Sequence, residues 1–261
     1  MRSLRHIPKK NLGQNFLHDK RMQQRIVDGC DLTENDIVLE IGPGQGAITR
    51  LIASKVDRMT CVEKDKDLIS ALVQEFKDTN VTVLSNDFLK MDLAALGDSI
   101  KIVGNIPYNI STPIIEKLID NSDHISQAYL TVQLEFGQRL AALPGSRDYG
   151  ALSCFVQYHT DVKVLFNIKS HCFKPAPKVD SCFVRLDFKA PAKYHPLDEK
   201  LMFRFIRSVF TQRRKNILNA AALLVDKTKM TAILETLKIP PNTRPESLSL
   251  QNFVDISHRL V

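Results

Sequence analysis

The sequence predicts an α/β protein built on a mostly parallel sheet with an antiparallel end, followed by a small helical domain. Short apolar runs alternate with helical patterns between residues 37 and 133, as in consecutive βαβ units. Two further strand-like runs, residues 162–166 and 180–188, have no helical pattern between them and indicate the antiparallel end. From Asp198 onward the apolar spacing is helical throughout, which indicates the second domain.

Length and composition fit one large domain and one small one. The chain has 261 residues, of which 44% are hydrophobic. No apolar run reaches the ~18 residues of a membrane span, and the basic N-terminus lacks the apolar segment of a secretory signal. Five scattered cysteines without a CxxC motif favour free buried thiols and a cytoplasmic protein over a disulfide frame or a zinc site. They are Cys30, Cys61, Cys154, Cys172 and Cys182.

Positive charge is concentrated at the two ends of the sequence. The formal net charge of +7 is the balance of +6 in residues 1–25, −6 in residues 26–184 and +7 in residues 185–261. Either basic flank alone is typical of a solvated surface. Two flanks of the same sign around an acidic body favour a polyanion that is held from two sides.

A glycine turn follows the first long strand. Residues 37–41 are apolar apart from one acid, Gly42, Gly44 and Gly46 follow in the order G-P-G-x-G, and a helical pattern begins at Ala47. This is the opening of a βαβ unit, in which glycines let a ligand approach the backbone closely. The spacing differs from the dinucleotide fingerprint, and the absence of a following Lys-Ser/Thr pair disfavours ATP or GTP hydrolysis. A glycine turn by itself is also common in proteins that bind nothing there.

Acidic residues follow the next two strands. Glu63 comes after residues 58–62, where an acid is placed to accept hydrogen bonds from two ribose hydroxyls. Asp87 comes after residues 81–84, and its carboxylate can accept from an adenine amine while Phe88 packs nearby. Taken singly, Glu63 also fits a helix start and Asp87 also fits a turn. After a glycine turn and in this order, they favour a nucleoside pocket.

The fourth strand, residues 100–103, leads into a polar corner. Asn105 offers an amide oxygen, Pro107 holds φ near −65°, and Tyr108 offers a flat face. Such a corner suits a planar nitrogenous base whose exocyclic amine must be held still.

Capping residues and prolines indicate the helices and loops of the remaining segments. Asp19 is expected to cap a helix that begins next to it, and residues 13–17 read as a loop with Phe16 as a core anchor. Residues 139–150 read as a long polar loop, and two prolines within residues 172–179 fix an extended loop with Phe173 at its head. A linker is expected at residues 190–196, with helices after it at residues 201–210, 214–225, 230–237 and 250–260.

Six segments in this order resemble one family. They are residues 13–17 (GQNFL), 40–46 (EIGPGQG), Glu63, 86–88 (NDF), 105–111 (NIPYNIS) and 173–181 (FKPAPKVDS). The chain resembles the rRNA adenine dimethyltransferases of the KsgA (RsmA) type over roughly residues 10–260. The resemblance implies a Rossmann-like class I methyltransferase fold with a seven-stranded sheet. It also implies S-adenosylmethionine-dependent dimethylation of two adjacent adenosines near the 3′ end of small-subunit rRNA, during ribosome assembly.

The resemblance also implies roles for particular residues. Residues 1–189 would form the catalytic domain and residues 190–261 a helical RNA-binding domain. The cofactor would be held by Asn15, Leu17, Gly42, Gly44, Glu63, Lys64, Asp87, Phe88 and Asn105. The target adenine would be held by Asn105, Ile106, Pro107 and Tyr108, with Phe173 on its other face. The rRNA phosphates would be contacted by Lys9, Lys10, Arg213, Arg214 and Lys215. The partner would be small-subunit rRNA or an immature 30S particle, and the protein is expected to be a monomer.

Three alternatives remain beside this interpretation. An Erm-type enzyme, which methylates large-subunit rRNA and confers macrolide resistance, also fits the Asn105–Tyr108 corner. A DNA adenine methyltransferase more usually carries two prolines in this corner and a target-recognition insertion. A non-catalytic assembly factor would have no need of Asn105, Glu63 and Asp87.

Overall fold

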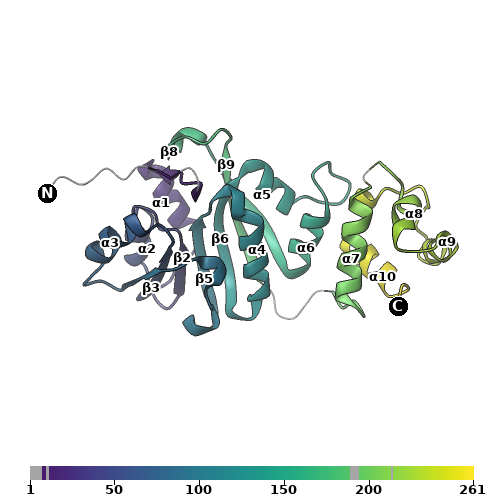
Figure 1. Ribbon diagram of the computed structural model, residues 1–261, viewed down its shortest axis with the longest axis horizontal. Coiled ribbons are helices and arrows are strands. Elements are labelled where there is room, and N and C mark those ends of the chain that lie inside the picture. The colour runs from purple at the N-terminus through teal and green to yellow at the C-terminus, as the bar shows by residue number, and fades with distance from the viewer. Residues whose placement is uncertain (1–7, 10–11, 189–193, 213) are drawn as a thin grey trace. The chain divides into compact units, whose positions relative to one another are not determined.

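The computed structural model describes residues 8–9, 12–188, 194–212 and 214–261. The chain divides into two compact units (Figure 1). The first contains Met1–Gly137 and Asp161–Phe188, and the second contains Gln138–Thr160 and Lys189–Val261. The sequence analysis placed the boundary at residue 189 and assigned all earlier residues to the first domain. The structure differs in one segment, because Gln138–Thr160 belongs to the helical unit.

The first unit is built on a seven-stranded sheet with the strand order β4-β3-β2-β5-β6-β9-β7 (Figure 1). The strands are β2 (Ile37–Ile41), β3 (Arg58–Glu63), β4 (Val81–Ser85), β5 (Ile100–Asn105), β6 (Ile125–Gln133), β7 (Thr160–Ile168) and β9 (Ser181–Phe188). The first five run parallel to their neighbours, and β9 pairs antiparallel with β6. The predicted α/β fold, with a seven-stranded, mostly parallel sheet and an antiparallel end, is confirmed.

The strand order places the carboxyl ends of four strands along one edge. The chain moves outward from β2 to β3 and β4 and then returns to β5 on the other side of β2. A point where the strand order reverses in this way opens a crevice at the carboxyl ends of the strands, where open α/β sheets bind ligands. The helices between and around these strands are α1 (Lys20–Asp28), α2 (Thr49–Ala53), α3 (Lys66–Glu75), α4 (Ser111–Asp120) and α5 (Leu134–Leu140). Helix α1 is capped by Asp19, whose side chain accepts from the Met22 backbone N–H, as predicted.

A two-stranded sheet joins segments that are far apart in the sequence. Strand β1 (Phe16–Leu17) pairs antiparallel with β8 (Phe173–Lys174), with Phe16 opposite Lys174 and Leu17 opposite Phe173. Both segments were expected to be loops. Two-residue strands show no alternation of apolar and polar residues, so local sequence carried no signal for them.

The second unit is helical and has a core of its own. It contains α6 (Ala151–His159), α7 (Glu199–Phe210), α8 (Ile217–Ala220), α9 (Lys227–Thr236) and α10 (Leu250–Ser257). Its buried cluster includes Cys154 from α6, Phe205 and Val209 from α7, and Phe253 from α10. All five cysteines of the chain are free and buried, as expected. Among the described residues, no helix is long and apolar enough to cross a membrane.

Candidate active site

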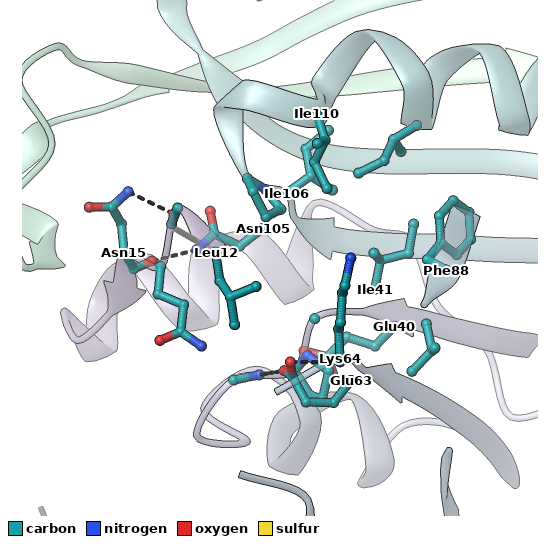
Figure 2. A pocket seen from close by; sticks show the side chains of 18 of the residues that line it. Leu12, Asn15, Glu40, Ile41, Glu63, Lys64, Phe88, Asn105, Ile106 and Ile110 are labelled. Atoms are coloured by element: carbon teal, nitrogen blue, oxygen red, sulfur yellow. Dashed lines mark hydrogen bonds between the residues drawn. The ribbon is translucent and has the colours of Figure 1, made fainter. Parts of the chain in front are cut away.

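A cavity of about 270 Å³ opens at the carboxyl ends of β2, β3, β4 and β5, and all of its lining residues belong to the first unit. Figure 2 shows Ile106 and Ile110 on one side of it and Glu63 on the other. All nine residues expected to bind a cofactor line it: Asn15, Leu17, Gly42, Gly44, Glu63, Lys64, Asp87, Phe88 and Asn105. Ile106, Pro107 and Tyr108 line it as well. Residues from five separate segments thus form one pocket.

The glycine turn after β2 forms one wall of the cavity. Gly42 and Gly44 have φ of 65° and 58°, a left-handed conformation that residues with a Cβ rarely adopt. A Cβ added at Gly42 would meet no atom within 4 Å, so the turn faces open space there. A Cβ at Gly44 would lie 2.9 Å from the ring of Phe16, which packs directly on the backbone. The glycines therefore allow the left-handed conformation of the turn, and Gly44 also allows the close approach of the Phe16 ring.

Glu63, at the end of β3, is held by backbone N–H groups. Its Oε2 accepts from Gly44 (3.1 Å), and its Oε1 accepts from Lys64 (2.9 Å) and Asp65 (2.8 Å). The side chain is buried, and burial raises the pKa of the carboxyl while the three backbone donors oppose the rise. Glu63 thereby fixes the glycine turn, and a carboxylate with about four lone-pair sites still has about one to offer a ligand hydroxyl.

Asp87, after β4, is paired with a lysine across the cavity rim. Its Oδ2 accepts from Lys64 Nζ at 2.9 Å, and its Oδ1 accepts from the Leu89 backbone N–H at 3.1 Å. The hydrogen bond from Lys64 is the largest cause of the lowered pKa of Asp87. The carboxylate is therefore ionised at neutral pH and suited to accept from an amine.

The corner after β5 is fixed at two points. The Ile106 backbone N–H donates to Thr131 O at 3.3 Å, which continues the pairing of β5 with β6. The Asn105 side chain donates from Nδ2 to Asn15 O at 2.8 Å, a bond drawn in Figure 2. Because the amide nitrogen is used in this way, the amide oxygen is the atom that remains to accept from a ligand. The local turn Tyr108–Ile110 then leads into α4.

Residues 12–17, here called the N-terminal strap, line the cavity, and Phe16 of the strap packs on Gly44 of the glycine turn. The strap is tied down through Asp65, whose side chain is buried. Gln14 Nε2 donates to Asp65 Oδ2 at 2.6 Å, and Lys9 Nζ lies 2.5 Å from Asp65 Oδ1 and 2.6 Å from Asp67 Oδ2. Sequence reasoning missed Gln14 and Asp65, since their contact joins positions 51 residues apart.

A model of the family described as ribosomal RNA adenine dimethylase matches residues 5–261, which is nearly the whole chain. The chain belongs to the ribosomal RNA adenine dimethylase family. It is a methyltransferase.

Curated relatives of this dimethylase are named Ribosomal RNA small subunit methyltransferase A. One from Fusobacterium nucleatum is 39% identical, with 95% of this chain and 96% of the relative covered. One from Pseudomonas fluorescens is 41% identical, with 98% and 94% covered. Among solved structures, a dimethyladenosine transferase from Plasmodium falciparum matches with a TM-score of 0.78 at 25% identity, covering 92% of this chain and 95% of that one. The 23S rRNA methyltransferase ErmE matches with a TM-score of 0.76 at 25% identity, covering 94% and 99%.

Phe173 does not reach the cavity of the dimethylase. Its side chain is 2% exposed and belongs to the buried core of the first unit. In the pairing of β1 with β8, Phe173 lies opposite Leu17, and opposed residues of an antiparallel pair share a face. Leu17 is in the same core cluster. The expectation that Phe173 covers the second face of a bound base is therefore not met in this structure.

The residues expected to contact RNA differ in their exposure and in the contacts that they make. Arg214 and Lys215 are exposed in the helical unit, as a phosphate contact requires. Lys9 of the dimethylase is instead engaged by Asp65 and Asp67. Lys10 and Arg213 lie outside the described residues.

Glu40 is a cavity residue that the sequence analysis did not assign. It lines the cavity from within β2, is 3% exposed, and accepts from Thr49 Oγ1 at 2.6 Å and from Cys61 Sγ at 3.6 Å. Burial raises the pKa of Glu40 to about 7. Its signal in the sequence was one acid inside an otherwise apolar strand. In the part of the chain that the structure describes, no group of three or more His, Cys, Asp or Glu could hold a metal ion.

Proposed function

We propose that this dimethylase transfers methyl groups from S-adenosylmethionine to N6 of two adjacent adenosines near the 3′ end of small-subunit rRNA. The observation that carries the proposal is the single cavity that unites the glycine turn, Glu63, Asp87 and the Asn105–Tyr108 corner. The glycine turn, Glu63 and Asp87 would bind a nucleoside, and the Asn105–Tyr108 corner would bind the amine of the target base.

The residues present fit S-adenosylmethionine. Beside Gly42 there is room at the backbone, as a ligand lying against the turn requires. Glu63 would accept from the ribose, and ionised Asp87 would accept from the adenine amine next to Phe88. When bound, the cofactor supplies a methyl group that is electrophilic because it is attached to a sulfonium.

The protein's part in the chemistry is to prepare the nucleophile. The lone pair of an adenine N6 is delocalised into the ring, which makes the amine a poor nucleophile. Asn105 Oδ1 and the Ile106 carbonyl accept the two amine hydrogens and direct the lone pair at the methyl group. This is preorganised electrostatics with positioning, and it requires no general base, because the proton leaves after N6 has become cationic.

Tyr108 holds the target base by stacking. The adenine must leave its own stack to enter the cavity, and an aromatic ring offsets part of that cost, about 1–3 kcal/mol per base. Tyr108 lines the same cavity as Asn105 and Ile106, which supports this role.

Small-subunit rRNA is the substrate that the relatives' names support. Relatives with those names are 36–41% identical to the chain, whereas the 23S rRNA enzyme ErmE is 25% identical. We further propose that the enzyme acts in the cytoplasm as a monomer on an immature 30S particle. The catalytic unit binds the cofactor, and the helical unit contacts rRNA phosphates through Arg214 and Lys215.

The decisive experiment is methylation of purified immature small subunits with labelled donor, comparing wild type with Asn105→Ala. We expect label on the two adjacent adenosines near the 3′ end with wild type, and about a 10²-fold loss of rate in the variant. If the wild type labels neither subunits nor naked rRNA, the proposal fails. Label on large-subunit rRNA instead would identify an Erm-type activity.

A further inference from the structure

The hydroxyl of Tyr108 is bound to a buried serine from another part of the sheet. Tyr108 Oη lies 2.6 Å from Ser181 Oγ, and the two residues are 73 positions apart in the chain. Tyr108 lines the cavity, whereas Ser181, at the start of β9, is fully buried. Burial raises the pKa of Tyr108, so the hydroxyl is protonated at neutral pH and the bond joins two neutral groups.

Ser181 is itself held rigidly on both sides. It is paired with Gln133 in the antiparallel ladder of β6 and β9. The preceding residue, Asp180, accepts from the Ser170 backbone N–H at 3.0 Å and from Lys169 Nζ at 2.9 Å. The Leu134 backbone N–H also donates to the Asp180 carbonyl at 3.0 Å. The Ser181 hydroxyl therefore has a fixed position, and a hydrogen bond to it can fix the position of the Tyr108 side chain.

We propose that Ser181 is a positioning residue for the methyl transfer, because it fixes the plane of the Tyr108 ring against which the target adenine stacks. The inference rests on the proposed stacking role of Tyr108. The tyrosine stands in a short local turn, so its backbone alone leaves the ring free to rotate about its side-chain bonds. The bond at the far end of the ring removes this freedom. A stacked base then arrives with its amine in the plane set by Asn105 and Ile106.

A double-mutant cycle with Ser181→Ala, Tyr108→Phe and the double variant tests the proposal. Each variant removes the same bond and keeps the aromatic ring. We expect each of the three to lose about three- to tenfold in kcat/KM for the RNA substrate, the range that one neutral hydrogen bond provides. The two losses should not add in the double variant, and the Kd for the cofactor should be unchanged in all three proteins.

Thermal unfolding separates positioning from a merely structural role. Ser181→Ala leaves the tyrosine hydroxyl without its partner in a mostly buried place, whereas the double variant removes both groups. We therefore expect the double variant to regain the Tm lost in Ser181→Ala without regaining kcat/KM. If activity recovers together with Tm, the role is structural and the proposal is overturned. Should Ser181→Ala fail to fold, Tyr108→Phe still removes the bond, and wild-type kcat/KM in that variant overturns the proposal.

Two further variants distinguish a failure of the Ser181 positioning role from a failure of the proposed function. Ser257→Ala removes another buried serine hydroxyl, which donates to Val254 O at 2.7 Å in the helical unit, and it should leave kcat/KM unchanged. Tyr108→Ala removes the ring itself. If Tyr108→Ala severely lowers kcat/KM while Ser181→Ala matches wild type, the positioning role of Ser181 is refuted and the stacking role of Tyr108 stands. If Tyr108→Ala is fully active, the stacking role fails, and the positioning role of Ser181 fails with it.

Discussion

The side-chain amide of Asn105 donates to the main-chain carbonyl of Asn15, 2.8 Å away. This bond joins the N-terminal strap, which lines the cavity, to the residue that we propose receives the target amine. An amide can rotate by half a turn and exchange its donor and its acceptor, and the Asn15 carbonyl selects one of the two orientations. The orientation of the proposed acceptor is therefore set by a segment that also lines the cavity.

Asn105→Asp should impair methyl transfer even though it keeps an acceptor oxygen. The variant replaces the Nδ2 donor by a second oxygen, which the Asn15 carbonyl repels. We expect kcat to fall about tenfold or more, with a smaller change in the Kd for the cofactor. Asn121→Asp is a matched control, because the Asn121 amide also donates to a backbone carbonyl at 2.8 Å, that of Lys117, away from the cavity. Equal activity of Asn105→Asp and wild type would contradict this account.

Gly44→Ala should weaken cofactor binding. Alanine is strained at φ of 58°, at a cost of about 1 kcal/mol, and its Cβ would press on the Phe16 ring and displace the N-terminal strap. We expect the Kd for S-adenosylmethionine to rise about tenfold or more in isothermal titration. Gly145→Ala is the control, since Gly145 has φ of 85° with open space around its Cβ and lies in the helical unit. A rise in Kd with Gly145→Ala as well would show that backbone strain alone explains the effect.

Glu40 should make the stability of the protein depend on pH. Its folded-state pKa of about 7 lies above the ordinary value of 4.5. The stability gained from the neutral acid is therefore fully present below about pH 4.5 and is lost as the pH rises through about 7. Glu40→Gln keeps an acceptor for Thr49 and removes the charge, so it should become more stable relative to wild type between pH 5 and pH 8, by on the order of 3 kcal/mol. Urea unfolding at both pH values measures this, and parallel pH profiles of the two proteins would refute it.

The double variant Arg214→Ala with Lys215→Ala should weaken RNA binding and flatten its salt dependence. Each lost phosphate contact lowers the slope of log K against log salt by about 0.7–0.9. We therefore expect a slope smaller by about 1.5 and unchanged cofactor affinity. Lys77→Ala removes an exposed charge from the first unit and serves as the comparison. A slope that stays at the wild-type value would remove these two residues from the RNA contact.

Local patterns were sufficient to predict the sheet and the main wall of the cavity. The strand before Gly42, the acid after β3 and the corner after β5 each lie within a few residues of their own signal. The Leu17–Phe173 pairing and the burial of Phe173 in the core have no local signal in the sequence. Asp65 was missed because its partners, Lys9 and Gln14, are more than 50 residues away.

Helix α6 has a practical consequence for dissecting the enzyme. Its residues precede β7 in the chain, yet Cys154 and Val156 are fully buried. The ring of Phe155 packs edge-on against the ring of Phe203 in α7, with 5.4 Å between the ring centroids. Truncation after residue 188 would keep α6 but delete α7, so the fragment would expose an apolar helix face to water and be prone to aggregate. The residues of the two compact units are interleaved along the polypeptide. A soluble catalytic fragment therefore requires replacing residues 138–160 with a short linker as well as removing the C-terminal helices.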